Sequence, residues 1–176
     1  GVSWNLSPFY PFPYGRAIQE DLERARHAAE AFSTRYMGRI KRKKLAPRAL
    51  LSALKAYESI HEMAMRPYGF ATLRQAADTT DHERNSLLER VRTEWYHIRR
   101  HIRFLESEIQ GLDSARLSGL AEEPTLASYR RYLLRILSKR PHILPEDQER
   151  IIELKHLSGR HALVAMYDAL MGSRAF

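Results

Sequence analysis

The chain ends in the stretch RPHILPEDQERIIELKHLSGRHALVAMYDALMGSRAF, which occupies residues 140–176. Pro145 suits the first turn of a helix, because its missing N–H has no partner there. Acidic residues follow it, near the positive end of the helix dipole. Gly159 permits a tight turn, and Ser158 before it can cap a second helix. That helix has apolar residues at the spacing of one helix face: Leu163, Met166, Tyr167 and Leu170.

The same helical spacing recurs upstream. It predicts a first helix over residues 16–36, ended by Gly38 and the basic residues after it. Further helices are predicted from Pro47 to an interruption at Pro67 and Gly69, over 68–77, over 82–110, and after a cap at Thr125. The segment from Asp113 to Pro124 reads as a connector with a short turn.

The predicted helix over residues 82–110 is the clearest. Its apolar residues alternate steps of three and four, and the helix would be about 45 Å long. They are Leu88, Val91, Trp95, Ile98, Ile102, Leu105, Ile109 and Leu112. A seam of this length needs a long helical partner. With no strand pattern in the sequence, the predicted fold is all-α: an elongated array of long antiparallel helices without a sheet.

Residues 1–15 differ from the rest of the chain. Aromatic residues alternate with prolines there, and such dense prolines preclude an ordinary helix. The segment is predicted to be a strap whose rings lie over helix ends and close the core. A PxxP ligand is a weaker interpretation of the same residues. The expected organisation is therefore a strap over 1–15 and a single helical domain over 16–176.

Charge and composition limit the function further. The 176 residues carry a net charge of +8 and no cysteine, which excludes disulfides and thiolate chemistry. No apolar run approaches the roughly 20 residues that span a bilayer, so we expect no membrane partner and a cytoplasmic protein. Seven positive charges and no acid lie in one segment, residues 35–48. We interpret it as a solvated connector, and the alternative is a polyanion site.

The residues do not form a zinc-peptidase signature. His61-Glu62-Met63-Ala64-Met65 has Met at the second ligand position, and His97-Ile98-Arg99-Arg100-His101 lacks the glutamate base. Glu-x-x-His also occurs three times, as in di-iron bundles, at Glu58/His61, Glu94/His97 and Glu153/His156. Helical phase turns these pairs away from a shared interior. His61, on an apolar face, is predicted to be a core histidine with its hydrogen bonds satisfied.

Several short motifs resemble the N-terminal helical region of the oligoendopeptidase F branch of the thimet oligopeptidase family. Trp4-Asn5-Leu6 with Phe9-Tyr10-Pro11 resembles the opening of those sequences, and Ala77-Asp78-Thr79-Thr80-Asp81 and Tyr167-Asp168-Ala169-Leu170 recur in them. The motif residues singled out, with structural roles expected for each, are Arg140, Pro141, His142, Ser158, Gly159, Arg160, Asp168, Asp78 and Thr79. Departures at Pro145, His161 and Tyr167 affect packing and capping only.

The resemblance implies a function for a larger protein. Family members are zinc metallopeptidases that cleave short peptides, and this region walls one side of their substrate channel. Their zinc helix lies in another part of the chain, so zinc is implied for the complete enzyme and no cofactor for these 176 residues. The chain alone is predicted to be inactive, and no catalytic or peptide-contacting residue is identified.

The expected partners follow from this resemblance. They are the rest of the peptidase chain, short peptides in the complete enzyme, and a second copy of this piece in isolation. The apolar seam over residues 88–112 and the last helix are the expected sources of exposed apolar surface for that self-association. Nucleic acid is not an expected partner. Two alternatives remain open: an independent helical scaffold or adaptor, and a basic nucleic-acid-binding helical module.

Overall fold

The structure is a computed structural model that describes residues 5–12, 15–42, 45–139, 148, 151–152, 155 and 159–172. The chain divides into two compact units, residues 1–137 and 138–176, and each is described by itself. This division differs from the expected one, which separated 1–15 from 16–176. Helices, turns and irregular segments account for the described residues, with no strand among them. The all-α prediction is confirmed.

The first helix, α1, runs from Arg16 to Tyr36, as predicted. Its buried residues follow one helix face, from Ile18 through Ala25 to Phe32. Gly38 ends it with a φ of 74°, a left-handed conformation in which a side chain is strained. The loop that follows Gly38 carries the rest of the basic segment, residues 35–48.

Helix α2 runs without interruption from Pro47 to Ala77, so the predicted break at Pro67 is wrong. A proline inside a helix removes one backbone hydrogen bond and usually kinks or breaks it. Here Pro67 is itself buried, and Phe70 and Ala71 beyond it are fully packed in the core. We attribute the continuity to that packing, which the helical residues on both sides of Pro67 share.

The predicted helix over 82–110 is two helices, α3 from His82 to Ile102 and α4 from Phe104 to Gln110. Arg103 separates them with φ −59° and ψ −25°, which is close to helical backbone. The apolar rhythm therefore continues across the break. The seam is nearly all core, so the expectation that it exposes apolar surface is wrong: Leu88, Val91, Ile98, Ile102, Leu105, Ile109 and Leu112 are at most 4% exposed.

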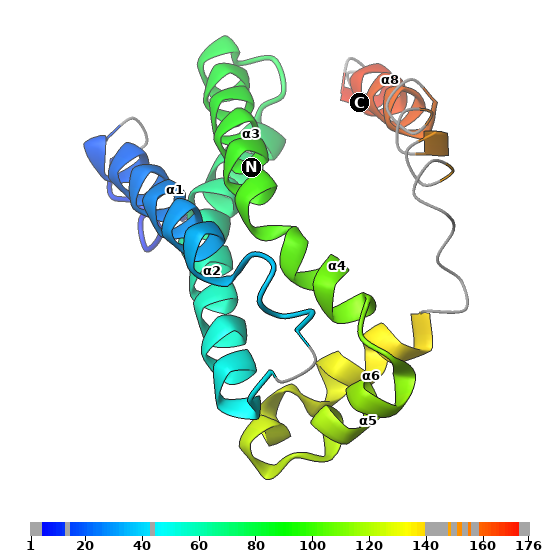
Figure 1. Ribbon diagram of the computed structural model, residues 1–176. Coiled ribbons are helices and arrows are strands. Elements are labelled where there is room, and N and C mark those ends of the chain that lie inside the picture. Colours follow the sequence, from blue (N-terminus) through cyan, green and yellow to red (C-terminus); the bar gives the residue numbers. More distant parts are fainter. Residues whose placement is uncertain are drawn as a thin grey trace. The chain divides into compact units, whose positions relative to one another are not determined.

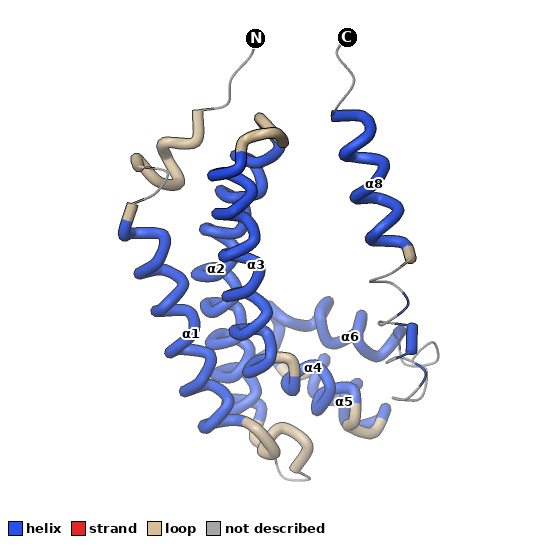
Figure 2. Tube along the Cα trace, turned by 90° about the horizontal axis from the view of Figure 1, so that it is seen from above, coloured by secondary structure: helices blue, strands red, loops and turns tan. Residues whose placement is uncertain are grey.

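Helices α1, α2 and α3 form an antiparallel bundle in which each contacts the other two (Figures 1 and 2). Aromatic side chains also join α1 to α2 and to α4. The Phe32 ring lies 5.0–6.3 Å, centroid to centroid, from the rings of Tyr36, Tyr57 and Phe104. The α3 seam therefore has the long helical partners that its length was expected to need.

Three short elements follow the bundle: α5 (Ser114–Glu122), the 3₁₀ helix η1 (Pro124–Tyr129) and α6 (Arg130–Lys139). The expected connector from Asp113 to Pro124 is thus mostly helical. The Asp113 side chain caps α5 by accepting a hydrogen bond of 2.8 Å from the Arg116 N–H. The helix predicted after Thr125 begins instead as η1 and becomes α-helical at Arg130. These elements gather at the end of the bundle where α2 begins (Figure 1).

The N-terminal strap is fixed to the bundle by a buried carboxylate. Tyr10 is 3% exposed, and its hydroxyl donates to Asp21 Oδ2 at 2.5 Å. Arg66 binds the same carboxylate at 3.7 Å, donates to the Phe9 carbonyl and lies over the Tyr10 ring. Arg24 pairs with Asp21 from the other side. The expectation that the strap's rings close the core is met by Tyr10, whereas Phe9 and Phe12 are 37% and 73% exposed.

The second unit contains α8, from Arg160 to Gly172. Gly159 precedes it at a close approach of the backbone, since a Cβ there would lie 2.7 Å from the Lys155 carbonyl oxygen. The described part of the unit leaves six apolar side chains of α8 exposed: Leu163, Val164, Met166, Tyr167, Leu170 and Met171. Most of the helix predicted after Pro145 lies outside the described residues, although Gln148, Ile151, Ile152 and Lys155 are helical.

Over the described ranges, no helix combines the length and apolar character needed to cross a bilayer.

Candidate functional site

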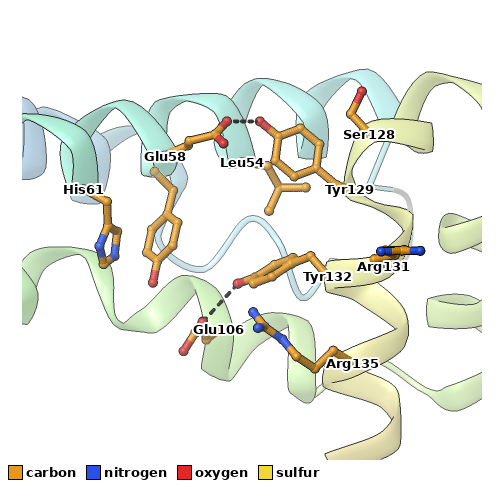
Figure 3. Close-up of a pocket in the computed structure, with 10 residues that line it drawn as sticks. Leu54, Glu58, His61, Glu106, Ser128, Tyr129, Arg131, Tyr132 and Arg135 are labelled. Atoms are coloured by element: carbon orange, nitrogen blue, oxygen red, sulfur yellow. Dashed lines mark hydrogen bonds between the residues drawn. The ribbon is translucent and has the colours of Figure 1, made fainter.

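A cavity of about 610 Å³ lies in the first unit, between α2, α4 and the η1–α6 segment (Figure 3). This volume falls in the range typical of small-ligand sites. Aromatic rings and charged groups alternate around it. It is lined by Leu54, Tyr57, Glu58, His61, Glu106, Ser128, Tyr129, Arg131, Tyr132 and Arg135.

Helix geometry brings these side chains together. Leu54, Tyr57 and His61 lie at i, i+3 and i+7 of α2, which places them on one face. Arg131 and Arg135 are one turn apart on α6. In Figure 3, His61 lies at one end of the cavity and Arg131 at the other.

Two tyrosine hydroxyls are held by carboxylates across the cavity. The Tyr129 hydroxyl donates to Glu58 Oε2 at 2.6 Å, and the Tyr132 hydroxyl donates to Glu106 Oε1 at 3.1 Å (Figure 3). Burial and the Glu58 hydrogen bond raise the pKa of Tyr129 to about 12. Burial and the Glu106 charge raise the pKa of Tyr132 further. Both hydroxyls therefore remain donors at neutral pH.

The pKa of Tyr57 is raised as well. Burial and the charge of Glu106 raise its pKa to about 12, and Arg99 opposes them. The same glutamate therefore acts on both Tyr57 and Tyr132. The floor of the cavity therefore consists of neutral phenol rings. Two of these rings, Tyr129 and Tyr132, donate hydrogen bonds to the carboxylates beside them.

His61 does not behave as the sequence predicted. Its Nε2 atom is buried and has no hydrogen-bond partner among the described residues. Burial lowers the pKa of His61, and Arg99 adds to the effect while Glu106 opposes it. Its ring packs against Tyr57 and Trp95 at centroid distances of 4.5 and 5.1 Å. The Nε2 atom of His61 is thus buried and has no described hydrogen-bond partner, and His61 lies at one end of the cavity (Figure 3).

The two arginines give the cavity its positive rim. The Arg135 guanidinium lies 5.5 Å from the centroid of the Tyr132 ring, within cation–π range. Arg131 and Arg135 are both exposed. Their planar, permanently charged heads suit carboxylate or phosphate groups.

The motif residues Asp78 and Thr79 lie elsewhere, in the turn between α2 and α3. Asp78 Oδ1 accepts hydrogen bonds from the Thr80 N–H and hydroxyl at 3.0 and 2.7 Å, which lower the pKa of Asp78. The Thr79 carbonyl accepts from Asn85 at 2.9 Å. Asp81 then caps α3 by binding two N–H groups. These residues shape a turn and do not contribute to the cavity.

The remaining motif residues belong to the second unit. Gly159 forms the close turn described above, and Arg160 and Asp168 lie in α8, where their side chains are not described. Four of the predicted residues lie outside the described residues: Arg140, Pro141, His142 and Ser158. The structure therefore does not bring the motif residues into one site.

Zinc is the metal that the resemblance implies for the family. Among the described residues, no group of three or more His, Cys, Asp or Glu side chains is placed to hold a metal ion. Glu58 and His61 do line the same cavity, although helical phase had separated them. The cavity's tyrosine and arginine side chains are poor partners for zinc, so the described residues do not fit a zinc site.

Sequence reasoning missed most of this cavity. It considered Glu58 and His61 as metal ligands and rejected both, and it predicted His61 to be a core histidine. It missed Glu106, Arg131, Tyr132 and Arg135 entirely. One available signal was the interleaving of Tyr129, Arg131, Tyr132 and Arg135 over seven positions, because α6 then shows arginines beside tyrosines.

The comparisons with known proteins fit the all-α architecture. Residues 108–176 match the family model described as Oligopeptidase F. A candidate peptidase from Chlamydophila abortus shares the fold with a TM-score of 0.66 at 22% identity, over 89% of this chain and 26% of that one. The chain therefore spans about a quarter of the length of that protein. No curated protein matches the chain.

The family match covers the terminal stretch, including the motif Tyr167-Asp168-Ala169-Leu170. It does not include the patches near residues 4–11 and 77–81, which rest on resemblance alone. The structural match extends over nearly the whole chain but, at 22% identity, carries the fold only. The predicted resemblance is confirmed over residues 108–176, which are similar to the Oligopeptidase F family model.

Proposed function

We propose that this chain is the non-catalytic helical part of a zinc metallopeptidase, walling one side of its substrate channel and restricting cleavage to short peptides. The observation that carries the proposal is the Oligopeptidase F match over residues 108–176. The length relation supports it, because the chain covers 26% of the structural relative and leaves ample room for a catalytic part.

The shared core of the first unit also supports this proposal. Its three long helices share one core, and α5 and η1 contact each other at one end of it. The strap is tied to the same core through Tyr10 and Asp21. Such a unit can exclude large substrates by shape without supplying a catalytic group, since folded or long chains would have to displace packed helices.

The partner of the second unit is part of the same proposal. Six exposed apolar side chains on the 13-residue α8 are unusual for a helix that faces only water. We propose that the rest of the peptidase covers them in the complete protein. In the isolated chain, a second copy is the expected substitute.

The test uses the complete protein in which this region continues into a catalytic part. Its hydrolysis rate is measured on a series of fluorogenic peptides of increasing length, ending with an unfolded protein. The proposal predicts zinc-dependent cleavage that falls sharply as the substrate lengthens. Equal rates across the series would contradict the wall, and a complete protein without peptidase activity would favour a scaffold.

A further inference from the structure

The cavity of Figure 3 has an amphiphilic lining that calls for a particular ligand. Leu54 is 2% exposed, and the half-buried rings of Tyr57, Tyr129 and Tyr132 lie beside it. Such a floor suits an apolar or aromatic group, because rings bury large apolar areas and pair with other rings. The rim adds arginines and glutamates, so the ligand must also carry charge.

The glutamates are not the groups left for a ligand. Glu58 and Glu106 each accept a tyrosine hydroxyl, at 2.6 and 3.1 Å. These bonds orient the phenol rings and occupy one oxygen of each carboxylate. Two carboxylates in the lining also disfavour a polyanion such as a nucleic-acid backbone, since like charges brought together are costly.

The arginines point instead to a single carboxylate. Arg131 lies at the end of the cavity opposite His61 (Figure 3). Its guanidinium can bind both oxygens of a carboxylate at once. At the other end, the buried His61 Nε2 lacks a protein partner among the described residues and can accept an N–H.

We propose that this cavity binds the C-terminal residue of a short peptide that ends in an apolar or aromatic side chain. The side chain lies on Leu54 and Tyr132, the α-carboxylate binds Arg131, and a backbone N–H donates to His61. This subsite deepens the proposed function and rests on it for the peptide as ligand. The cavity volume of about 610 Å³ leaves room for more than one residue.

The experiment compares two peptides on the full 176-residue chain by titration calorimetry. One is an N-acetylated tripeptide that ends in Phe with a free carboxylate, and the other is the same peptide amidated at its C-terminus. A hydrogen-bonded charge pair contributes enough for the amide to bind about tenfold more weakly. Equal binding of the two peptides, or no binding of either at millimolar concentration, would overturn the proposal.

Variants assign the effect to the cavity. Arg131→Gln should lower binding of the free acid to the level of the amide and leave binding of the amide unchanged. The matched control is Arg100→Gln, which removes the same charge from an exposed position on α3 outside the cavity. Both positions are exposed, so both variants should fold, as circular dichroism will show. A similar loss in both variants would mean only general charge attraction and would refute the subsite.

A second readout is the His61 imidazole resonance, identified by its absence in His61→Gln. The free-acid peptide should shift it, and a resonance that stays fixed while the peptide binds would place the ligand elsewhere. A single-stranded oligonucleotide that binds wild type, loses binding in Arg131→Gln and displaces the peptide would replace the proposal by a nucleic-acid site.

These results are separable from the proposed function. Suppose that the complete protein cleaves short peptides while this chain shows no preference for a free carboxylate. The proposed subsite is then refuted, and the proposed channel-wall function is retained. If the chain binds as predicted but the complete protein has no peptidase activity, the proposed subsite is retained and the proposed channel-wall function is refuted.

Discussion

Glu108 offers the sharpest test of how the basic segment is held. Its carboxylate, on α4, accepts three backbone N–H groups from the loop after α1. Oε1 lies 2.6 Å from the Gly38 nitrogen, and Oε2 lies 3.1 and 3.3 Å from the nitrogens of Ile40 and Lys41. Ile40 is 1% exposed and is thereby anchored in the core. We predict that Glu108→Ala destabilises the first unit.

The magnitude follows from these contacts. The bonds to Gly38 and Ile40 are partly buried, and each contributes roughly 1 kcal/mol, whereas the exposed bond to Lys41 contributes less. The expected loss in the free energy of unfolding is therefore about 2–3 kcal/mol. For a chain of this size it corresponds to a fall in Tm of roughly 5–10 °C. Glu108→Gln keeps one carbonyl acceptor and should lose about half as much.

The assay is urea unfolding followed by circular dichroism. The control is Glu89→Ala, which removes an exposed carboxylate that pairs with Arg92 on the surface of α3. Such pairs contribute at most about 1 kcal/mol. If Glu108→Ala and Glu89→Ala unfold at the same urea concentration, water replaces the Glu108 carboxylate at no cost in free energy. The predicted contribution of Glu108 to stability is then refuted.

Three further predictions concern other parts of the chain. Gly159→Ala should reduce the helicity of residues 138–176, because its Cβ would meet the Lys155 carbonyl at 2.7 Å; helicity unchanged by circular dichroism would contradict the close approach. His61 has a pKa lowered from its usual 6.5, so its contribution to stability is complete above pH 6.5 and declines as the pH falls towards the folded-state pKa. Melting curves from pH 7.5 to 5 should show this decline in stability, and His61→Gln should reduce the decline. If the variant has the same pH profile as the wild type, His61 is not its cause. Leu163→Glu with Leu170→Glu should reduce self-association measured by light scattering and leave helicity nearly intact; loss of helicity with unchanged association would place the interface elsewhere.

The sequence predicted the bundle well because its signals are local. The 3–4 spacing from Ile18 to Phe32 and the left-handed Gly38 specify α1 within the helix itself. The Asp81 cap similarly marks the beginning of α3, since its side chain binds N–H groups only two and three residues away. At these two boundaries the deciding contacts lie within one turn, and prediction and structure agree.

The errors arise where tertiary contacts or subtle backbone changes decide. Arg103 separates α3 from α4 with nearly helical backbone angles, so the spacing of the apolar residues gives no sign of the break. Pro67 stays helical because the residues around it are buried, which a local rule against proline cannot anticipate. The α3 seam was expected to expose apolar surface, although α1 and α2 of the same chain cover it.

The candidate site was the least predictable feature. Glu58 and Tyr129 are 71 positions apart, and Glu106 and Tyr132 are 26 apart. No periodicity links residues on different helices, so their hydrogen bonds emerge only once α2, α4 and α6 are packed. The orphaned nitrogen of His61 likewise depends on what surrounds it in three dimensions.

The central claim is that this chain is the non-catalytic part of a peptidase. The most direct measurement is hydrolysis of one fluorogenic short peptide by the 176-residue chain and by the complete protein, with zinc content determined for both. The account predicts an inert chain without stoichiometric zinc and a complete protein that cleaves the peptide with zinc bound. Cleavage by the chain alone, or a complete protein that binds no zinc and leaves the peptide intact, would contradict it.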